Sequence, residues 1–199
     1  ICGYHGWHDW YLSANLGDND NLAGHLLQGL EPKGVPKDLK GSVVPFNYNR
    51  IDELETIIQN HDIGVIKMEV SRNDEPQDDF LVKVRKIADN NNIVLIFDEC
   101  TSGFRQSNGG LHKIYGVEPD IIAISKSLGG AKSSISSYVA NKKVFKKSYG
   151  SLTGALLHST TYNSLAEECV TVIETTNLLN NKKLLNNLKN LDNCIKNKL

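Results

Sequence analysis

The amino-acid sequence predicts a layered α/β fold. Short apolar runs alternate along the chain with segments in which apolar residues recur at helical spacing. The runs are continuous, as in residues 93–97, which is typical of strands that are covered on both faces in a parallel sheet. The 199 residues are 40% hydrophobic and 23% charged, the composition of a folded globular chain of one domain with a remainder.

The first strand and helix pattern lies in residues 43–70. Residues 43–46 form a short apolar run that predicts a strand. A helix is predicted next, because apolar residues recur there at helical spacing: Ile51, Leu54, Ile57 and Ile58. Residues 64–70 return to an apolar run and predict a second strand.

A second helix follows, and further strands come after it. The helix is predicted from a single apolar face, formed by Phe80, Leu81, Val84, Ile87 and Ala88. Three consecutive asparagines, residues 90–92, provide a polar stop before the buried strand 93–97. Residues 120–125 repeat the strand pattern, and residues 135–140 are a weaker candidate for another strand.

Two segments depart from this alternation. Residues 13–41 are rich in Gly, Asn, Asp and Pro with weak periodicity, so a long irregular excursion is predicted there. The tail predicts an amphipathic helix that packs on the rest of the domain, because its apolar residues recur at spacings of three and four: Leu184, Leu188, Leu191, Ile195 and Leu199.

Charge and composition exclude several kinds of partner. The 22 Lys+Arg residues against 23 Asp+Glu leave a formal net charge of −1, which gives no electrostatic reason to expect nucleic acid or a membrane surface. No apolar run approaches the ~20 residues that a bilayer span needs. The four cysteines form no C-x-x-C pair, so neither a zinc site nor a disulfide framework is indicated, and we expect a cytoplasmic protein.

Two carboxylates stand where the strand 93–97 ends. Asp98 and Glu99 follow it directly, and ligands of open α/β sheets bind at this edge, so Asp98 is predicted to point into a site. The alternative is structural: Asp98 caps the following turn and Glu99 faces the solvent. A nucleoside-triphosphatase site is not favoured, because it needs an upstream G-x-x-x-x-G-K-[ST] loop that the chain lacks.

The strand 120–125 ends next to a potential nucleophile. Lys126 follows it and precedes the glycine pair 129–130. A lysine in a narrow turn of small residues can be partly desolvated, which disfavours the charged form and makes the amine a better nucleophile. Taken alone, the segment favours an ordinary exposed lysine.

Two further segments are candidates for ligand binding. Residues 3–10 place aromatic rings between glycines and can form a stacking platform. A metal site on His5 and His8 is not favoured, because Gly6 opposes the helix that would bring both imidazoles to one face. Residues 158–163 carry hydroxyls before an apolar-periodic helix, where N-capping is the simpler interpretation and phosphate binding the other.

Taken in this order, the four segments resemble class III of the pyridoxal-phosphate (PLP) dependent aminotransferases, most closely the glutamate-1-semialdehyde aminomutase-like branch. The resemblance covers about residues 1–176. It rests on the opening 4–9, the strand end 97–105 with Asp98, Glu99 and Gly103, and the segment 119–126 that ends in Lys126. It implies the large domain of fold-type I, three α/β/α layers around a mainly parallel sheet.

The resemblance implies roles for the two residues at the strand ends. Lys126 would form the internal aldimine with PLP and then shuttle a proton between the substrate α-carbon and the cofactor. Asp98 would pair with the pyridinium nitrogen and keep it protonated, so that the ring accepts the electrons released when a C–H bond breaks. Both residues are therefore expected to be catalytic.

The resemblance also implies further cofactor contacts. Tyr4 would stack on the ring face, and His5 belongs to the same cofactor-binding segment. Thr161, or Thr160 in its place, would reach the phosphate of the neighbouring subunit's cofactor. Glu69 falls near the site in relatives, and its role stays open.

The activity that follows from the resemblance is transfer of an amino group between an amino acid and a carbonyl compound. The small-molecule donor and acceptor would bind in a homodimer with shared active sites, without metal. An intramolecular amino shift of the aminomutase type begins with the same steps and is the alternative. A non-catalytic relative that keeps the fold without cofactor is the second alternative.

The chain also departs from the family pattern. A serine-rich turn follows Lys126, and no proline follows Glu69. The phosphate-binding turn before residue 4 and most of the C-terminal small domain have no counterpart, and there is no initiator Met. We expect a fragment, with a large-domain core in residues 1–176 and a helix in 177–199 leading toward a truncated small domain, and we do not expect this chain alone to be a competent enzyme.

Overall fold

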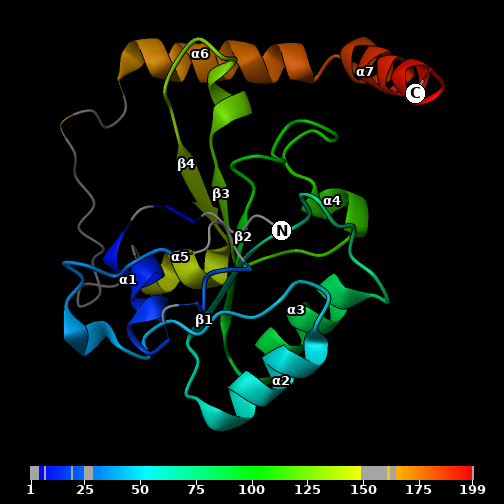
Figure 1. The fold of residues 1–199 in the computed structure, drawn as a ribbon. Helices are drawn as coiled ribbons and strands as arrows, with labels where there is room; N and C mark the ends of the chain where they lie inside the picture. The colour runs from blue at the N-terminus through cyan, green and yellow to red at the C-terminus, as the bar shows by residue number, and fades with distance from the viewer. Residues whose placement is uncertain are drawn as a thin grey trace. The chain divides into compact units, whose positions relative to one another are not determined.

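The computed structural model describes residues 5–6, 8–18, 20–24, 29–148, 161 and 165–198 (Figure 1). The chain divides into two compact units, Ile1–Val94 and Leu95–Leu199, and each is described by itself. Among the helices of the described ranges, none has both the length and the apolar character that a membrane crossing needs.

The first unit combines helices with the strand β1. Its described elements are α1 Asp9–Ser13, η1 Ala14–Leu16, η2 Lys37–Leu39, α2 Ile51–Asn60, β1 Val65–Glu69 and α3 Phe80–Asn90. The predicted helices and the predicted strand in 64–70 are therefore confirmed. After Ser13, which ends α1, the described residues up to 41 form turns, irregular backbone and two short 3-10 helices, as the composition predicted.

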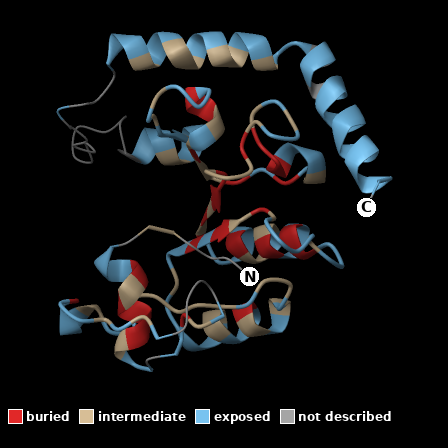
Figure 2. Ribbon diagram, turned by 45° about the horizontal axis from the view of Figure 1, so that its top comes forward, coloured by how far each residue is buried: buried red, intermediate tan, exposed pale blue. Residues whose placement is uncertain are grey.

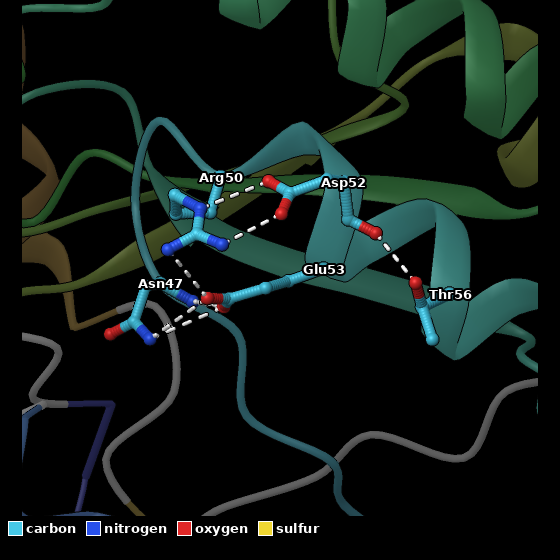
Figure 3. A network of polar contacts seen from close by, with 5 residues as sticks. All are labelled: Asn47, Arg50, Asp52, Glu53 and Thr56. Atoms are coloured by element: carbon cyan, nitrogen blue, oxygen red, sulfur yellow. Dashed lines mark hydrogen bonds and ion pairs between the residues drawn. The ribbon is translucent and has the colours of Figure 1, made fainter.

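Charged and polar side chains fix the start of α2 (Figure 3). Arg50 Nη2 donates to Asp52 Oδ2 at 2.7 Å, and Arg50 Nη1 lies 3.4 Å from Glu53 Oε1. The backbone N–H of Asn47 donates to Glu53 Oε2 at 2.9 Å. The hydrogen bond from Arg50 lowers the pKa of the Asp52 carboxyl. Two carboxylates in the first turn also interact favourably with the positive end of the helix dipole.

The core of the first unit forms on β1 and α3. Ile66 and Met68 of β1 are buried, and α3 also contacts α2. Four of the five apolar residues predicted for one face of α3 are buried, and the fifth, Ile87, is half-buried. The buried four are Phe80, Leu81, Val84 and Ala88. The helix ends at Asn90, where the run of asparagines begins, so the predicted polar stop is confirmed.

The strand predicted at residues 43–46 is wrong. This segment has no regular secondary structure, and Val43 packs instead against the buried cluster of Tyr11, Ala14 and Leu22. The run contains Pro45, whose nitrogen carries no hydrogen to donate to a strand ladder. Residues 43–46 are half-buried, so hydrophobicity alone predicted partial burial correctly and strand structure incorrectly.

The second unit is built on three paired strands in the order β2-β3-β4. β2 and β3 are parallel, with Ile96 opposite Ile121 and Asp98 opposite Ala123, whereas β3 and β4 are antiparallel. The described elements are β2 Val94–Asp98, α4 His112–Tyr115, β3 Ile121–Ile124, η3 Lys126–Gly129, β4 Ser137–Ala140, α5 Lys142–Ser148, α6 Ala166–Leu179 and α7 Lys182–Lys196. All three strands were predicted, and the α/β class is confirmed.

Asp120 joins the three strands at the end opposite to Asp98. Its backbone N–H donates to the Leu95 carbonyl at 2.9 Å, and its Oδ2 accepts from the Leu95 N–H at 2.9 Å. Its Oδ1 accepts from Asn141 Nδ2 at 2.7 Å, and its carbonyl accepts from the Asn141 N–H at 2.9 Å. One residue thus hydrogen-bonds to the start of β2 and to the residue after β4.

The tail forms the predicted amphipathic helix, but its apolar side chains are exposed. In α7, Leu188 is 44% exposed and Ile195 is 59% exposed. Figure 2 shows α7 as exposed along its length. The preceding helix α6 contacts η3 and α7. The prediction that the tail helix packs its apolar face on the rest of a domain is therefore wrong.

Candidate active site

Asp98 is the last residue of β2 and is buried. Its side chain is 6% exposed, although a carboxylate is seldom buried without partners. Its Oδ1 accepts from the backbone N–H of Cys100 at 3.2 Å. The predicted turn-capping contact therefore exists, and Asp98 also lies at the carboxyl edge of a buried parallel strand, as its assignment to a site requires.

Lys126 begins η3, two residues after β3 ends. Its backbone adopts the left-handed region, with φ of +44°, which is uncommon for a residue with a side chain beyond Cβ. The side chain is exposed, and Nζ donates to Thr101 Oγ1 at 2.9 Å. The preceding Ser125 is extended, and its hydroxyl donates to the Ile135 carbonyl at 3.1 Å. The amine is thus accessible and directed toward the residues that follow β2.

The strand register brings Asp98 and Lys126 to the same edge of the sheet. Asp98 lies opposite Ala123, three residues before Lys126, and the Glu99 N–H donates to the Ala123 carbonyl at 2.8 Å. The contact between Lys126 and Thr101 spans the same two strand ends. An accessible primary amine can condense with a carbonyl group, and a buried carboxylate at the same sheet edge can hold a protonated ring nitrogen.

Glu99 differs most from its expected position. It is fully buried, with 0% exposure, so the alternative that placed it in solvent is wrong. Its Oε2 accepts from the Ser102 hydroxyl at 2.6 Å and from the Leu111 N–H at 2.8 Å. Its Oε1 accepts from the His112 N–H at 2.9 Å and lies 2.7 Å from His112 Nδ1, which donates when protonated.

The hydrogen bonds around Glu99 also determine its charge state. Burial by itself raises the pKa of this carboxyl, but the bonds from His112, from Ser102 and from the backbone of His112 and Leu111 outweigh it. The pKa of Glu99 therefore lies below its ordinary value. The carboxylate is held in its charged form. Its hydrogen bonds to Ser102, Leu111 and His112 hold the two ends of the loop between β2 and α4 together.

Two glycines pack closely on Glu99, Gly103 on its backbone and Gly110 on its carboxylate. A Cβ atom on Gly103 would lie 2.7 Å from the Glu99 carbonyl oxygen, which also accepts the Gly103 N–H at 2.8 Å. A Cβ atom on Gly110 would lie 2.5 Å from His112 Nδ1 and 2.7 Å from Glu99 Oε1. The glycine of the strand-end motif is thus explained by close packing on Glu99.

His5 and Glu69, also predicted as site residues, belong to the first unit. The His5 carbonyl accepts from His8 Nε2 at 3.1 Å and from Lys67 Nζ at 3.4 Å. His8 Nδ1 in turn accepts from the Tyr11 N–H at 3.1 Å, which uses the second ring nitrogen. Glu69, the last residue of β1, pairs through Oε1 with Arg72 Nη1 at 3.4 Å.

The remaining predicted site residues are Tyr4 and the two threonines, Thr160 and Thr161. Tyr4 and Thr160 lie outside the described residues, and Thr161 is an exposed turn residue. Helix α6 begins later than these hydroxyls: its N-cap is Leu165, without a side-chain hydrogen bond. The prediction that residues 158–163 cap the following helix is therefore wrong.

Sequence reasoning did not single out Thr101. It lies three residues after Asp98, inside the strand-end motif, but a threonine in a turn has no distinctive spacing. Its contact with Lys126 joins residues that are 25 positions apart. The sequence indicated this contact only indirectly. If β2 and β3 end at the same edge of the sheet, the turn after β2 must lie near Lys126, which follows β3.

The chain matches known proteins over most of its length. Residues 73–199 match the profile of the family described as aminotransferase class-III. The chain is 29% identical over 191 residues to 3-aminobutyryl-CoA aminotransferase of Cloacimonas acidaminovorans, covering 92% of this chain and 41% of that protein. It is 37% identical over 115 residues to glutamate-1-semialdehyde 2,1-aminomutase of Campylobacter hominis, covering 56% of this chain and 25% of that protein. The chain spans less than half the length of these relatives.

Solved structures show the same fold. An omega-transaminase from Sphaerobacter thermophilus superposes with a TM-score of 0.72 at 26% identity, covering 89% of this chain and 42% of that one. A transaminase with PLP bound superposes with a TM-score of 0.71 at 23% identity, covering 88% of this chain and 41% of that one. The predicted fold class, the large domain of fold-type I, is therefore confirmed.

Proposed function

The chain belongs to the class-III aminotransferases, and from that premise we propose that it carries the cofactor-binding core of an enzyme that transfers an amino group between an amino acid and a carbonyl compound. The observation that supports this most is the pairing of strand ends: the buried Asp98 and the accessible Lys126 follow neighbouring parallel strands. The 3-aminobutyryl-CoA aminotransferase relative, which matches over 92% of this chain, supports the transaminase over the alternatives.

The family implies PLP as the cofactor, and the two residues suit its reactive groups. Lys126 offers a primary amine in reach of the solvent, as an aldehyde requires, and Asp98 offers a buried carboxylate that can hold a proton on a ring nitrogen. When bound, PLP accepts the electron pair of a breaking substrate C–H bond. Lys126 Nζ would take that proton and return it, while Asp98 keeps its own charge against the ring nitrogen.

The other contacts with the cofactor are proposed from the resemblance. Tyr4 would stack on the ring, with His5 in the same segment. Thr161 or Thr160 would donate to the phosphate of the partner's cofactor. Glu69 would lie near the site, where its Oε1 pairs with Arg72 Nη1 at 3.4 Å. A homodimer with shared sites and a cytoplasmic location remain predictions.

An intramolecular amino shift is the second candidate. The similarity to glutamate-1-semialdehyde 2,1-aminomutase, 37% over 115 residues, favours it specifically. The two reactions differ in the fate of the amino group, which is exchanged with a second substrate in a transaminase and retained in a mutase. An active protein that contains these 199 residues, given a ¹⁵N-labelled amino donor, should release labelled product only if it is a transaminase.

The cofactor proposal is tested by absorbance. We expect PLP added to the 199-residue chain to produce a visible band that borohydride removes, and we expect Lys126→Ala to abolish that band. Lys132→Ala is the matched control, because Lys132 is an exposed lysine in the same turn, and it should leave the band intact. A band that survives in Lys126→Ala would reject Lys126 as the attachment point. No band in a longer protein that contains these 199 residues would favour a non-catalytic relative.

A further inference from the structure

The amine of Lys126 contacts Thr101, a residue to which the sequence motifs assign no role. Nζ donates to Thr101 Oγ1 at 2.9 Å. Because the hydroxyl oxygen accepts in this contact, the bond uses one of the hydrogens on the lysine nitrogen rather than a lone pair. The contact therefore restrains the amine while leaving it able to react once it is neutral.

Thr101 sits in a turn whose position is fixed on both sides. On one side, Glu99 is buried and its carboxylate accepts from Ser102, Leu111 and His112. On the other side, the Gly103 N–H donates to the Glu99 carbonyl at 2.8 Å. Residues 100–102 thus lie in a turn that the hydrogen bond from Gly103 to Glu99 closes. The backbone that carries the Thr101 hydroxyl is therefore held in place.

The backbone of Lys126 is equally constrained. Its φ of +44° is a conformation that costs free energy in a residue with a full side chain, and such residues cluster where the surrounding structure holds them for function. η3 continues into Leu128 and Gly129, both buried, and α6 contacts η3. A restrained backbone and a restrained amine leave the intervening side chain few conformations.

We propose that Thr101 is a positioning residue that holds Lys126 Nζ at the carboxyl ends of β2 and β3, so that the amine meets an aldehyde at the edge where Asp98 lies. This inference rests on the proposed function, because it assigns Thr101 a part in loading an aldehyde cofactor. Without the hydroxyl, the lysine side chain would sample more conformations and fewer of them would be productive.

The test measures how fast Lys126 captures an aldehyde, without using enzyme turnover. In the reaction the amine nitrogen bonds to the aldehyde carbon and the aldehyde oxygen leaves as water. Borohydride then adds hydride to the C=N carbon, and a proton from solvent completes a secondary amine that peptide mass mapping detects. The 199-residue chain is treated separately with PLP and with benzaldehyde, and labelling of Lys126 is divided by labelling of Lys132 in the same sample.

Three variants distinguish positioning from a general loss of structure. Thr101→Val keeps the shape and removes the hydroxyl, and loss of one hydrogen bond predicts capture slower by about three- to tenfold relative to Lys132. Thr101→Ser restores a hydroxyl and should stay within about twofold of the unchanged chain. Ser107→Ala removes a hydroxyl from the same loop that donates to Gly110 and should have no effect.

The outcomes separate this inference from the proposed function. If PLP gives no visible band but Thr101→Val still slows benzaldehyde capture, the cofactor proposal fails and the positioning role stands. If PLP gives the band and Thr101→Val captures both aldehydes as fast as the unchanged chain, the positioning role is wrong. Equal labelling of Lys126 and Lys132 in the unchanged chain would also overturn it, because no amine would then be specially placed.

Discussion

The two turns that meet at the candidate site are built in opposite ways. The loop after β2, residues 99–111, closes around the fully buried carboxylate of Glu99 and carries glycines fitted against it. The turn after β3, residues 125–136, has buried Leu128 and Gly129 but is otherwise mostly exposed, including Lys126 itself. One turn is held by several hydrogen bonds to a single charge, and the other presents the exposed amine that we propose as reactive.

The difference indicates how support and reactivity are divided between neighbouring strand ends. A reactive lysine has to remain accessible and able to change partners, so its own turn cannot bury it. The fixed position must then come from the adjacent turn, through Thr101. The following predictions test this division by changing one turn and then the other.

The largest effect is expected for Asp98→Ala. Removal of the buried carboxylate should slow α-proton exchange by about a hundredfold or more, the usual cost of removing one preorganised group that stabilises charge. Cofactor affinity should fall far less, because Lys126 is retained. Deuterium exchange at the amino-acid α-carbon, followed by NMR in an active protein that contains these 199 residues, measures the first effect, and a PLP titration measures the second. Equal losses in both would show that Asp98 serves binding alone.

Glu99→Ala should destabilise the fold more than any change in the other turn. It removes one partner of a buried network and leaves the Ser102 hydroxyl and the two backbone N–H groups unsatisfied, which costs about 3–5 kcal/mol. The matched change Lys126→Ala removes an exposed side chain and should stay within about 0.5 kcal/mol. Urea unfolding measures both, and similar values for the two variants would remove the contrast between the turns.

The glycines should show the same contrast on a smaller scale. In Gly103→Ala the new Cβ would lie 2.7 Å from a backbone oxygen that is itself hydrogen-bonded, so overpacking of about 1–3 kcal/mol is expected. In Gly129→Ala the nearest atom is the Ile135 Cγ2 methyl at 3.3 Å, which can move by a few tenths of an ångström. Thermal unfolding should rank Gly129→Ala as the milder change. The reverse order would mean that the loop after β2 is the more adaptable of the two.

Acid should weaken the loop after β2 selectively. The pKa of Glu99 is lowered in the folded chain by hydrogen bonds that outweigh its burial, relative to 4.5 for an ordinary glutamate. The carboxylate therefore contributes stability that is fully present above pH 4.5 and is lost as the pH falls through its lower folded value. Glu99→Gln, which does not titrate, should show a smaller decline in the free energy of unfolding between pH 5 and about pH 3. Identical declines would assign the acid sensitivity to other groups.

The elements that the sequence predicted well are those governed by local periodicity. The helix at α3 and the strand at β2 follow from apolar spacing and from three asparagines between them. The strand predicted at residues 43–46 is absent because Pro45 has no N–H to donate, which apolar character alone does not reveal. The tail helix was predicted from its own spacing, whereas its exposure depends on neighbours that spacing does not contain.

The candidate site was predictable to the extent that it lies at strand ends. Asp98 and Lys126 were identified because residues at the carboxyl ends of parallel strands share an edge. Glu99 was misplaced because three of its hydrogen bonds come from Leu111 and His112, twelve and thirteen residues further along. A local sequence pattern does not identify a hydrogen-bond donor at that separation. It also does not identify the contact between Thr101 and Lys126, which are 25 residues apart.

Asp120 gives this site a dependence on strand alignment. Asp120 hydrogen-bonds to both backbone groups of Leu95 and to Asn141 beyond β4. These bonds fix the register of β3 relative to β2 and β4. A slip of one residue between β2 and β3 would turn Asp98 to the opposite face of the sheet. The amine and the carboxylate would then face different sides of the sheet. Asp120, at one end of the sheet, thus helps to keep Asp98 and Lys126 on the same side at the other end.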